Sequence, residues 1–573
     1  MSEGSAQCDL LVVGSGAGGL SAAVTAASLG LKVIVVEKEA VYGGTTAWSG
    51  GWMWIPRNPL AMAAGIVEDA DGPRTYLRHE LGERYDDARV EAFLEHGPRM
   101  VAFFQQRSAL AFIDGNAVPD FHGRSPGALQ GGRSVCAAPF DARRLGARVA
   151  QLRPPLDLIS PWGMGIASGA ELRHFFNALS SWRSFVYVAR RVALHFKDLL
   201  MHRRGMRLVG GNALVAGLAK SAFDLGVELR VASPVRRLLR EADRVVGAVI
   251  GTPEGGEVEV RARRGVVLAC GGFPYDVARK QALFAHAPTG VEHCSAAPAS
   301  NTGDGLRLGE SVGAEVDTRL PNAAGWAPVS KVHRRDGSVG HFPHLVERAK
   351  PGLVAVTAAG RRFVNEAGAY HDFMSALFAA LPAGAPVEAW LVCDHRFIRR
   401  YGLGHARPAP FLLGPSLRSG YLKRANSIEA LAQVCGIDAE NFVAALDAYN
   451  REARRGRDPA FGRGGTPSER VQGDAARGVA GNPNVAPIEH GPFYAVKLLP
   501  GSLGTFAGLR TDASARVLAA DGTPIAGLYA CGADMASVMG GRYPSGGITL
   551  GPAMTFGYIA GQHAAGALPC ALP

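Results

Sequence analysis

The first fifty residues of the chain alternate between apolar runs and short glycine turns. One apolar run lies in Asp9–Val13, small residues with helical character fill Gly18–Leu29, and a second apolar run lies in Lys32–Glu37. Short apolar runs bounded by turn residues predict buried strands, whereas the longer segment between them predicts a helix. The order strand, turn, helix, strand predicts a βαβ unit at the start of the chain.

Similar apolar runs recur in three later parts of the chain. Residues 210–250 alternate between one helical segment and two strand-like segments, while 265–273 (GVVLACGGF) and 527–534 (GLYACGAD) each run into a glycine turn. Continuous apolar strands of this kind are typical of a sheet that is covered on both faces. They predict further strands of the same α/β sheet.

The middle of the chain has a different character. Between 281 and 499, proline-rich loops and amphipathic helices replace the buried strands, and a chain of 573 residues with 47% apolar content is long enough for two or three structural units. We therefore predict an α/β protein in which a discontinuous, Rossmann-like nucleotide-binding domain comprises residues 1–280 and 500–573. Residues 281–499 are expected to form an inserted α+β substrate domain.

A dinucleotide-binding fingerprint follows the first predicted strand. The segment Gly14–Gly19 has the form G-x-G-x-x-G, in which Gly14 permits the tight turn, Gly16 lets the backbone approach a pyrophosphate, and Gly19 lets the helix pack on the sheet. Glu37 ends the second strand about twenty residues later, where a carboxylate accepts hydrogen bonds from ribose hydroxyls. This context predicts a dinucleotide site at the helix N-terminus.

A second stretch rich in glycine and hydroxyl residues, Tyr42–Gly51, follows closely (YGGTTAWSGG). A nicotinamide enzyme has no evident need for it, whereas the longer FAD molecule must be held at further points along its length. We therefore expect FAD, with a simple loop as the alternative. Only one dinucleotide fingerprint is present, so no binding site for a nicotinamide cofactor is evident.

Charge and cysteine content exclude other classes of function. The formal net charge is +11, but the arginines are scattered and no nucleic-acid-binding motif is present, so we expect no nucleic-acid partner. The eight cysteines lie far apart without a Cys-x-x-Cys pair, and His341 and His344 have no obvious third ligand, so no metal site is predicted. Spaced thiols and the lack of a hydrophobic leader favour a cytoplasmic location.

One segment, 180–204, reads as a basic amphipathic helix. Such a helix either lies on anionic lipid, which would make the protein peripheral to the inner membrane, or packs on its own protein as an ordinary surface helix. One face is expected to carry Phe185, Val188, Val192, Phe196 and Leu199, with Arg190, Arg191 and Lys197 largely off it.

Several motifs together resemble the flavoprotein family of fumarate reductase and succinate dehydrogenase. They are YGGTTAWSGG, GVVLACGGF, NTGDG at 301–305, GRRFVNE at 360–366 and GLYACGAD, in this order along nearly the whole chain. Within that family, YPSGGITLGPAMTFGYIAG at 543–561 resembles the 3-ketosteroid dehydrogenases, particularly the Δ1 type. The resemblance implies non-covalent FAD, because Thr45 and Thr46 stand where succinate dehydrogenases carry a flavin-linking histidine.

The resemblance also implies which residues hold the cofactor. Glu37 would bind the adenosine ribose, Asp534 the ribityl chain, and the helix after Gly547 would direct its N-terminus at the flavin edge that gains negative charge on reduction. The residues implied as cofactor-binding are Gly14, Ser15, Gly16, Ala17, Gly18, Gly19, Glu37, Lys38, Gly43, Gly44, Thr45, Thr46, Ser49, Gly50, Gly51, Val235, Ala269, Gly271, Gly532, Asp534, Thr549 and Leu550.

The implied reaction is desaturation of the C1–C2 bond of a 3-ketosteroid or of a similar cyclic ketone. Such a reaction needs a hydride acceptor, a base for the α-proton and donors that stabilise the enolate oxygen. By resemblance, the Tyr543 hydroxyl and the Gly547 N–H would hold the ketone oxygen, and Tyr370 would take the proton. The electron acceptor is expected to be a quinone or a carrier protein.

Three alternatives stay open. Phe121 stands where the steroid enzymes have a second tyrosine, so His122 or His371 are candidate relays. Arg542 precedes the Tyr543 motif and could serve a fumarate-type enoate reductase running in the opposite direction. A flavin-binding electron carrier or sensor without catalysis is the third hypothesis, and Phe121 is its best support.

Overall fold

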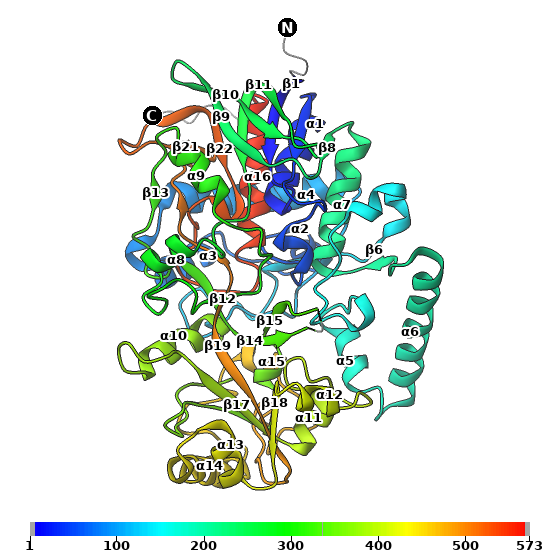
Figure 1. Ribbon diagram of the computed structural model, residues 1–573, viewed down its shortest axis with the longest axis vertical. Coiled ribbons are helices and arrows are strands. Elements are labelled where there is room, and N and C mark those ends of the chain that lie inside the picture. The colour runs from blue at the N-terminus through cyan, green and yellow to red at the C-terminus, as the bar shows by residue number, and fades with distance from the viewer. Residues whose placement is uncertain (1–5, 335, 568–573) are drawn as a thin grey trace.

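A computed structural model describes residues 6–334 and 336–567 of the chain. Two large sheets dominate it, one of eight strands and one of seven. Figure 1 shows the first sheet, with both chain ends, at the top of the molecule and the second sheet at the bottom. The strands of the first sheet come from both ends of the chain, whereas the second sheet uses strands from the middle.

The first sheet joins the two ends of the chain. Strand β1 (Ala6–Val13) pairs in parallel with β2 (Val33–Val36) and with β11 (Glu257–Leu268), and β11 pairs in parallel with β22 (Pro524–Ala530). The apolar runs of the sequence thus form the predicted Rossmann-like layer. The strand expected at 265–273 ends at Leu268. The other strands are β8 (Glu228–Arg230), β9 (Val235–Glu241), β10 (Arg244–Gly251) and β21 (Arg516–Leu518).

Two helices from opposite ends of the chain, α1 (Ala17–Ser28) and α16 (Leu550–Ala564), pack against each other beside this sheet (Figure 1). A Cβ atom on Gly557 would lie 2.3 Å from the Gly18 carbonyl oxygen, and one on Gly561 would lie 2.8 Å from the Ala22 carbonyl oxygen. Glycine therefore permits the close approach of the helices. This contact brings the fingerprint turn next to the Tyr543 motif.

The second sheet is organised around β19 (Phe493–Thr505), a strand of 13 residues. It pairs with β14 (Ala324–His333) on one side and with β17 (Ala389–Asp394) on the other. The domain boundaries at 280 and 500 stay a prediction. The remaining strands of this sheet are β12 (Cys294–Ser295), β15 (Val339–Pro343), β16 (Leu353–Val356) and β18 (Leu422–Ala425), and the helices nearby include α10 (Tyr370–Ala380), α11 (His395–Tyr401), α13 (Ile428–Cys435) and α14 (Ala439–Ala453).

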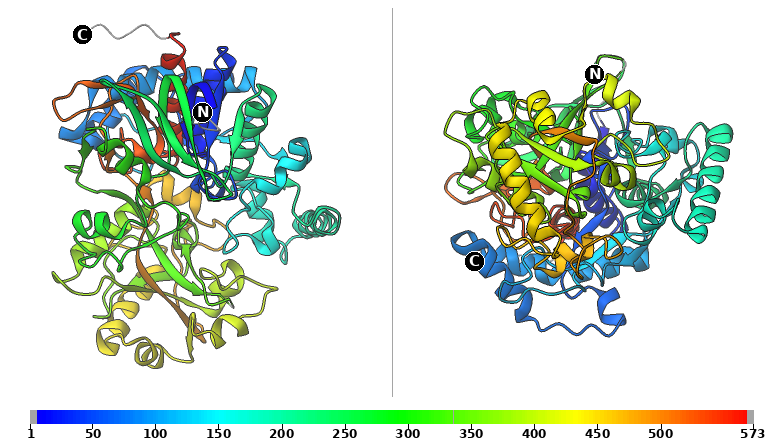
Figure 2. Two further views of the ribbon diagram at one scale, coloured as in Figure 1. Left: turned by 45° about the horizontal axis from the view of Figure 1, so that its top comes forward. Right: turned by 90° about the horizontal axis from the view of Figure 1, so that it is seen from below.

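A helical hairpin stands at the edge of the molecule. It consists of α5 (Ala170–Phe176) and α6 (Trp182–His202), and α6 forms the outermost ribbon on that side in both Figure 1 and Figure 2. The predicted helix is present, but its expected apolar face is divided. Val188, Val192 and Leu199 are partly buried, whereas Phe185 and Phe196 are exposed.

No helix within residues 6–334 and 336–567 combines the length and the apolar character that a membrane span requires.

Candidate active site

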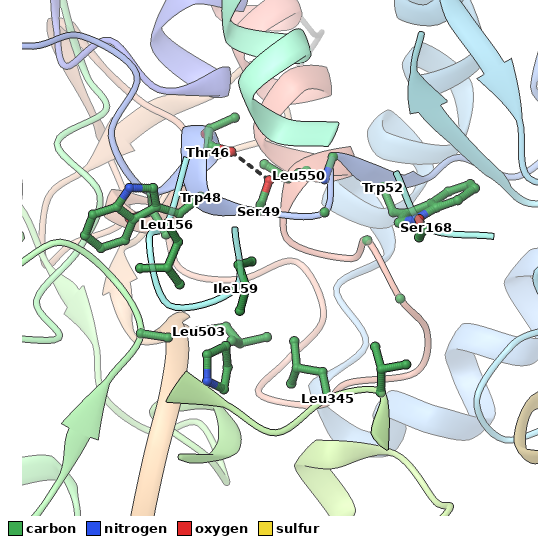
Figure 3. A pocket seen from close by; sticks show the side chains of 18 of the residues that line it. Thr46, Trp48, Ser49, Trp52, Leu156, Ile159, Ser168, Leu345, Leu503 and Leu550 are labelled. Atoms are coloured by element: carbon green, nitrogen blue, oxygen red, sulfur yellow. Dashed lines mark hydrogen bonds between the residues drawn. The ribbon is translucent and has the colours of Figure 1, made fainter. Parts of the chain in front are cut away.

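A cavity of about 2050 Å³ extends from the fingerprint turn to the second sheet. A pocket for one small molecule typically measures about 300–1,000 Å³, so this cavity has room for a dinucleotide and a second molecule. Figure 3 shows Thr46, Ser49 and Leu550 on one wall, with Leu345 and Leu503 facing them. The site is therefore enclosed by segments that are distant in the sequence.

Backbone shape determines the dinucleotide end of the cavity. Gly14 has φ +105°, and a Cβ atom there would lie 2.1 Å from the Ala269 carbonyl oxygen. A Cβ atom on Gly19 would lie 2.1 Å from the Gly14 carbonyl oxygen, whereas the space beside Gly16 is open up to the Thr46 hydroxyl at 3.4 Å. The first and third positions therefore need glycine for packing, and the second leaves room for a ligand.

The N-terminus of α1 is suited to an anion. Its N-cap residue, Gly16, makes no side-chain capping bond, and the first turn has no acidic residue. Thr46 Oγ1 accepts a hydrogen bond from the Ala17 N–H at 3.0 Å, which ties the second glycine stretch to the helix. The other N–H groups of the first turn and the helix dipole favour a phosphate at this position.

Glu37 is nearly buried and borders the cavity. The Ser15 hydroxyl donates to Glu37 Oε2 at 2.5 Å, and the Glu39 N–H donates to Glu37 Oε1 at 3.1 Å. The next residue, Lys38, pairs with Asp304 at 2.5 Å. These bonds hold the Glu37 carboxylate at the end of β2, where a ribose is expected.

Asn301 was missed in the prediction of the site, although it begins the NTGDG motif. Its Nδ2 donates to Thr45 Oγ1 at 2.9 Å and to the Gly271 carbonyl oxygen at 3.0 Å, and it lines the cavity. The amide therefore joins two loops that were both expected to hold cofactor. A sequence of small polar residues after a strand was the available signal.

Asp534 does not line the cavity and is fully buried beneath it. Its carboxylate accepts hydrogen bonds from the Cys270 N–H and, at 2.9 Å, from the Gly272 N–H. Asp534 therefore shapes the Gly271–Gly272 turn, and its contact with a ribityl chain stays a prediction. Gly43 stabilises the fingerprint turn, because its N–H donates to Ser15 Oγ at 2.9 Å.

The remaining cofactor candidates meet at the cavity. Contact of each with FAD stays a prediction, and Gly19, like Gly43 and Asp534, lies outside the lining. Those that line the cavity are Gly14, Ser15, Gly16, Ala17, Gly18, Glu37, Lys38, Gly44, Thr45, Thr46, Ser49, Gly50, Gly51, Val235, Ala269, Gly271, Gly532, Thr549 and Leu550.

The free space beside several glycines fits a bound dinucleotide. A Cβ atom on Gly44 would meet only the Gly16 Cα, at 3.9 Å, and one on Gly504 would meet nothing within 4 Å, although both residues line the cavity. Together with the N-terminus of α1 and the Glu37 carboxylate, this arrangement suits the phosphates and ribose of FAD.

Three aromatic rings meet at the other end of the cavity. The centroids of Tyr370 and Tyr543 lie 4.9 Å apart with the rings at 74°, and Phe121 lies 5.6 Å from Tyr370 and 6.1 Å from Tyr543. All three line the cavity, as does Gly547. The residues expected to hold and deprotonate a ketone are therefore neighbours.

Within the described residues, the carbonyl oxygen of Gly547 is hydrogen-bonded to the protein, whereas its N–H is not. Its carbonyl oxygen accepts from the Trp54 N–H at 3.1 Å, while no acceptor for the Gly547 N–H is found in the part of the chain that the structure describes. With φ +95°, a Cβ atom there would lie 2.7 Å from the Trp54 nitrogen. Glycine is therefore required, and its N–H is free for a ligand.

Tyr370 has an environment that opposes ionisation. Burial, followed by the charge and hydrogen bond of Tyr543, raises the pKa of Tyr370 well above its ordinary value, and Arg348 acts in the opposite direction. Burial also raises the pKa of Tyr543. Hydrogen bonds with Tyr370 and Thr549 partly offset this rise. The buried guanidinium of Arg348 donates to the carbonyl oxygens of His344 and Glu366 at 2.7 and 2.8 Å, so these bonds do not neutralise its charge.

The candidate relay His122 points elsewhere. Its Nδ1 contacts Glu80 at 2.5 Å, its Nε2 contacts Asp372 at 2.7 Å, and the residue does not line the cavity. Burial would lower the pKa of His122, but hydrogen bonds to Asp372 and Glu80 and their charges outweigh it and raise the pKa to about 10. The cation held by two carboxylates links α10 and α3 (Asp71–Leu81), and its expected part in proton transfer stays a prediction.

His371 and Arg542 also lie outside the lining. Burial lowers the pKa of His371 to about 4, and its Nδ1 accepts from the Trp326 N–H at 3.1 Å. The ring is therefore neutral, and its Nε2 is buried without a partner among the described residues. Arg542 is exposed at the surface, so the structure does not support it as a substrate-binding residue.

Comparisons with known proteins agree with this geometry. Residues 9–550 match the model of the FAD binding domain family. The chain is 39% identical over 560 residues to 4-oxocyclohex-2-ene-1-carboxylate 5-dehydrogenase of Sinomonas cyclohexanicum, covering 97% of this chain and 94% of that protein. It is 35% identical over 567 residues to 3-oxosteroid 1-dehydrogenase of Mycobacterium tuberculosis (strain H37Rv), covering 97% and 98%.

A solved structure shares the whole architecture. The crystal structure of 3-ketosteroid Δ1-dehydrogenase from Sterolibacterium denitrificans, in complex with 1,4-androstadiene-3,17-dione, matches with a TM-score of 0.90 at 35% identity, covering 98% of this chain and 100% of that one. The chain therefore belongs to the FAD-binding flavoprotein family, together with the 3-oxosteroid 1-dehydrogenases.

Proposed function

We propose that this flavoprotein desaturates a cyclic ketone next to its carbonyl group, and that the ketone is a 3-ketosteroid or a similar ring. The observation that carries the proposal is the meeting of Tyr370 and Tyr543, with centroids 4.9 Å apart, on a cavity wall that also contains Gly547. This wall offers two donors and one proton acceptor to a single ligand. Relatives named as dehydrogenases of oxosteroids and oxocyclohexene carboxylates support the same reaction class.

Each residue has one task in the proposed reaction. The Tyr543 hydroxyl and the Gly547 N–H hold the ketone oxygen and stabilise it as it gains negative charge. Tyr370 Oη accepts the proton from the carbon beside the carbonyl. FAD, when bound without a covalent link, supplies the acceptor for the hydride that leaves the next carbon.

Ionisation of Tyr370 is the demanding step, because the pKa of this residue lies above its ordinary value. Phe121 has no hydroxyl to share the proton, and neither His122 nor His371 lines the cavity. The nearby Arg348 is the cation that lowers the pKa of Tyr370. We therefore assign Arg348 as a positioning residue that favours the Tyr370 phenolate.

The size and lining of the cavity favour a bulky apolar ketone. Beyond the tyrosine pair, Leu156, Ile159, Leu345 and Leu503 line it (Figure 3). Apolar side chains gain by covering the rings of a steroid. A monocyclic oxo acid is the second candidate, because Arg407 also lines the cavity and could face a carboxylate.

The electron acceptor is proposed to be a quinone or a carrier protein. We also propose that the protein is cytoplasmic, with peripheral membrane contact through residues 180–204, where α6 lies. An apolar ketone and a quinone both partition into lipid, so one location would serve both.

A panel of substrates tests the proposal. The purified yellow protein is mixed with a dye acceptor and either 4-androstene-3,17-dione or 4-oxocyclohexanecarboxylate, and in parallel with fumarate and reduced dye. We expect dye reduction with at least one ketone and no reoxidation by fumarate. Reoxidation by fumarate would instead support an enoate reductase, and silence in every assay with FAD still bound would support an electron carrier or sensor.

A further inference from the structure

Four polar side chains form a hydrogen-bonded chain behind one wall of the cavity. Ser330 Oγ of β14 contacts Tyr421 Oη at 2.8 Å and His344 Nε2 at 2.7 Å. His344 Nδ1 contacts Oε1 of Glu347, the first residue of the 3₁₀ turn η5 (Glu347–Ala349), at 2.6 Å. Of these four residues, Glu347 alone lines the cavity, so the chain ends at the site.

The chain fixes the charge and the direction of the Glu347 carboxylate. Burial would raise the pKa of Glu347, but the charge and hydrogen bond of His344 outweigh burial and lower this pKa below its ordinary value. The carboxylate is therefore ionised at neutral pH, and an ionised carboxylate accepts hydrogen bonds only. His344 Nδ1 thus donates to Oε1, while Ser330 and Tyr421 hold the fully buried imidazole ring from behind.

The second carboxylate oxygen of Glu347, Oε2, is left for a ligand. Among the residues that the structure describes, His344 is the one charged partner within 4.0 Å of Glu347, and its bond goes to Oε1. The neighbouring Leu345 and Val346 line the cavity too, and Figure 3 shows Leu345 on this wall. An acceptor in apolar surroundings is costly to leave unpaired, so a donor of the ligand is expected opposite Oε2.

The charges around the cavity favour a neutral donor over a charged one. Two cations, Lys350 and Arg407, line the same cavity. Lys350 Nζ donates to the carbonyl oxygens of Gln472 and Gly473 at 2.5 and 3.0 Å, and the Arg407 guanidinium lies 5.5 Å from the Phe411 ring centre, so these contacts neutralise neither charge. The two cations oppose a cationic ligand, and the carboxylate opposes an anionic group beside it. A hydroxyl group donates without carrying charge.

We infer that Glu347 Oε2 accepts a hydrogen bond from a hydroxyl group of the substrate. The ketone oxygen is assigned to Tyr543 and Gly547, so this hydroxyl is a second polar group of the same molecule. Resting on the proposed function, the inference narrows the substrate class to cyclic ketones that also carry a hydroxyl group. A site that bonds a hydroxyl discriminates against an analogue without it, because the buried acceptor then stays unpaired.

Pairs of ligands that differ only in this group test the inference. The first pair is 17β-hydroxyandrosta-1,4-dien-3-one with androsta-1,4-diene-3,17-dione, and the second is prednisolone with prednisone, which exchange a hydroxyl for a ketone at carbon 11. The Kd of each for the FAD-loaded protein is measured from the change in the flavin absorbance spectrum. In at least one pair, the hydroxyl compound should bind at least about tenfold more tightly, because its donor meets a charged acceptor. Equal binding within both pairs would overturn the inference.

The variant Glu347→Gln should remove or reverse this preference, because an amide also donates and can therefore bond the ketone. A preference that persists in Glu347→Gln would overturn the assignment of Oε2. Glu388→Gln is the matched control, since Glu388 pairs with Lys497 away from the cavity, and it should bind all four compounds like the wild type.

Ser330→Ala provides a second test should Glu347→Gln lose its FAD or its Tm. It removes the hydroxyl behind His344 and leaves the carboxylate in place. The preference for the hydroxyl compound should then weaken a few-fold, because the imidazole that directs Oε1 is less firmly held. An unchanged preference in this variant would contradict the role given to the hydrogen-bonded chain.

The outcomes separate this inference from the proposed function. All four compounds already have the C1–C2 double bond, so their binding is measured without turnover. A preference for the hydroxyl compound without turnover of any saturated ketone would support the Glu347 subsite and count against the reaction. Turnover of ketones with equal binding inside both pairs would leave the reaction in place and refute the subsite.

Discussion

The two ends of the cavity are lined by different parts of the polypeptide. At the dinucleotide end, glycines and backbone N–H groups form the surface, and Gly14 and Gly19 leave no room for a side chain. At the ketone end, side-chain rings form the surface, and Tyr370, Tyr543 and Phe121 come from three separate segments. Backbone shape selects the cofactor, whereas side-chain chemistry selects the reaction.

This difference predicts that substitutions at the two ends fail in different ways. A change at the dinucleotide end should remove the flavin and with it every activity. A change at the ketone end should leave the protein yellow and slow the reaction.

The largest effect is expected for Gly14→Ala. The new Cβ atom would lie 2.1 Å from the Ala269 carbonyl oxygen at φ +105°, so the turn cannot keep its shape. The ratio of flavin absorbance to protein should fall nearly to zero. Gly30→Ala is the matched control, because Gly30 has φ +89° but nothing within 4 Å of its Cβ position, and it should retain FAD.

Tyr370→Phe should have the next largest effect. The variant loses the proton acceptor, which typically contributes about 10²–10⁴-fold to a rate. Its kcat with the best ketone should fall by that factor while FAD content stays at the wild-type level. Tyr449→Phe is the control, because it removes a hydroxyl that donates to the Ala486 carbonyl oxygen away from the cavity, and it should keep full activity. An active Tyr370→Phe variant would refute the assignment of Tyr370 as the base.

Arg348→Met should change the pH profile. The charge of Arg348 lowers the pKa of Tyr370, so its loss raises that pKa further and moves the rising limb of kcat/KM to higher pH. A shift of one pH unit corresponds to about a tenfold loss at neutral pH. The FAD content and Tm report folding, and a lower kcat/KM with an unshifted limb would show that Arg348 acts only on structure.

The smallest effect is expected for His122→Gln, through stability. The pKa of His122 rises from 6.5 to about 10 in the folded protein, so its stabilising effect is complete below pH 6.5 and disappears as pH rises through about 10. The variant should melt about 1 to 3 °C below the wild type near neutral pH, and the difference should vanish near pH 10. A constant difference across this range would contradict the proposed ion pairs with Glu80 and Asp372.

The same contrast explains which parts of the fold and of the site could be predicted from the sequence. The turn at Gly14–Gly19 was predictable because its geometry excludes other residues, and the structure has that geometry. The tyrosine pair was expected only by resemblance, since no local pattern brings Tyr370 near Tyr543. The roles of Asn301 and Arg348 were not predicted, because their contacts join segments that are distant along the chain.

Helix α6 shows a further limit of periodicity. The spacing of apolar residues predicted an amphipathic helix, and α6 is present. Which side faces the protein was decided by Glu171, which binds Arg191 and Arg207 from outside the helix. A partner charge of this kind cannot be read from the helical repeat alone.

Anaerobic reduction of the bound flavin by the best ketone of the panel tests the central claim most directly. In the wild type, the visible flavin band should bleach in step with formation of the unsaturated ketone. Tyr543→Phe should contain as much FAD but bleach about 10²–10³ times more slowly, because it lacks one donor to the developing enolate. Bleaching of Tyr543→Phe at the wild-type rate would contradict the claim that Tyr543 and Gly547 hold the ketone oxygen.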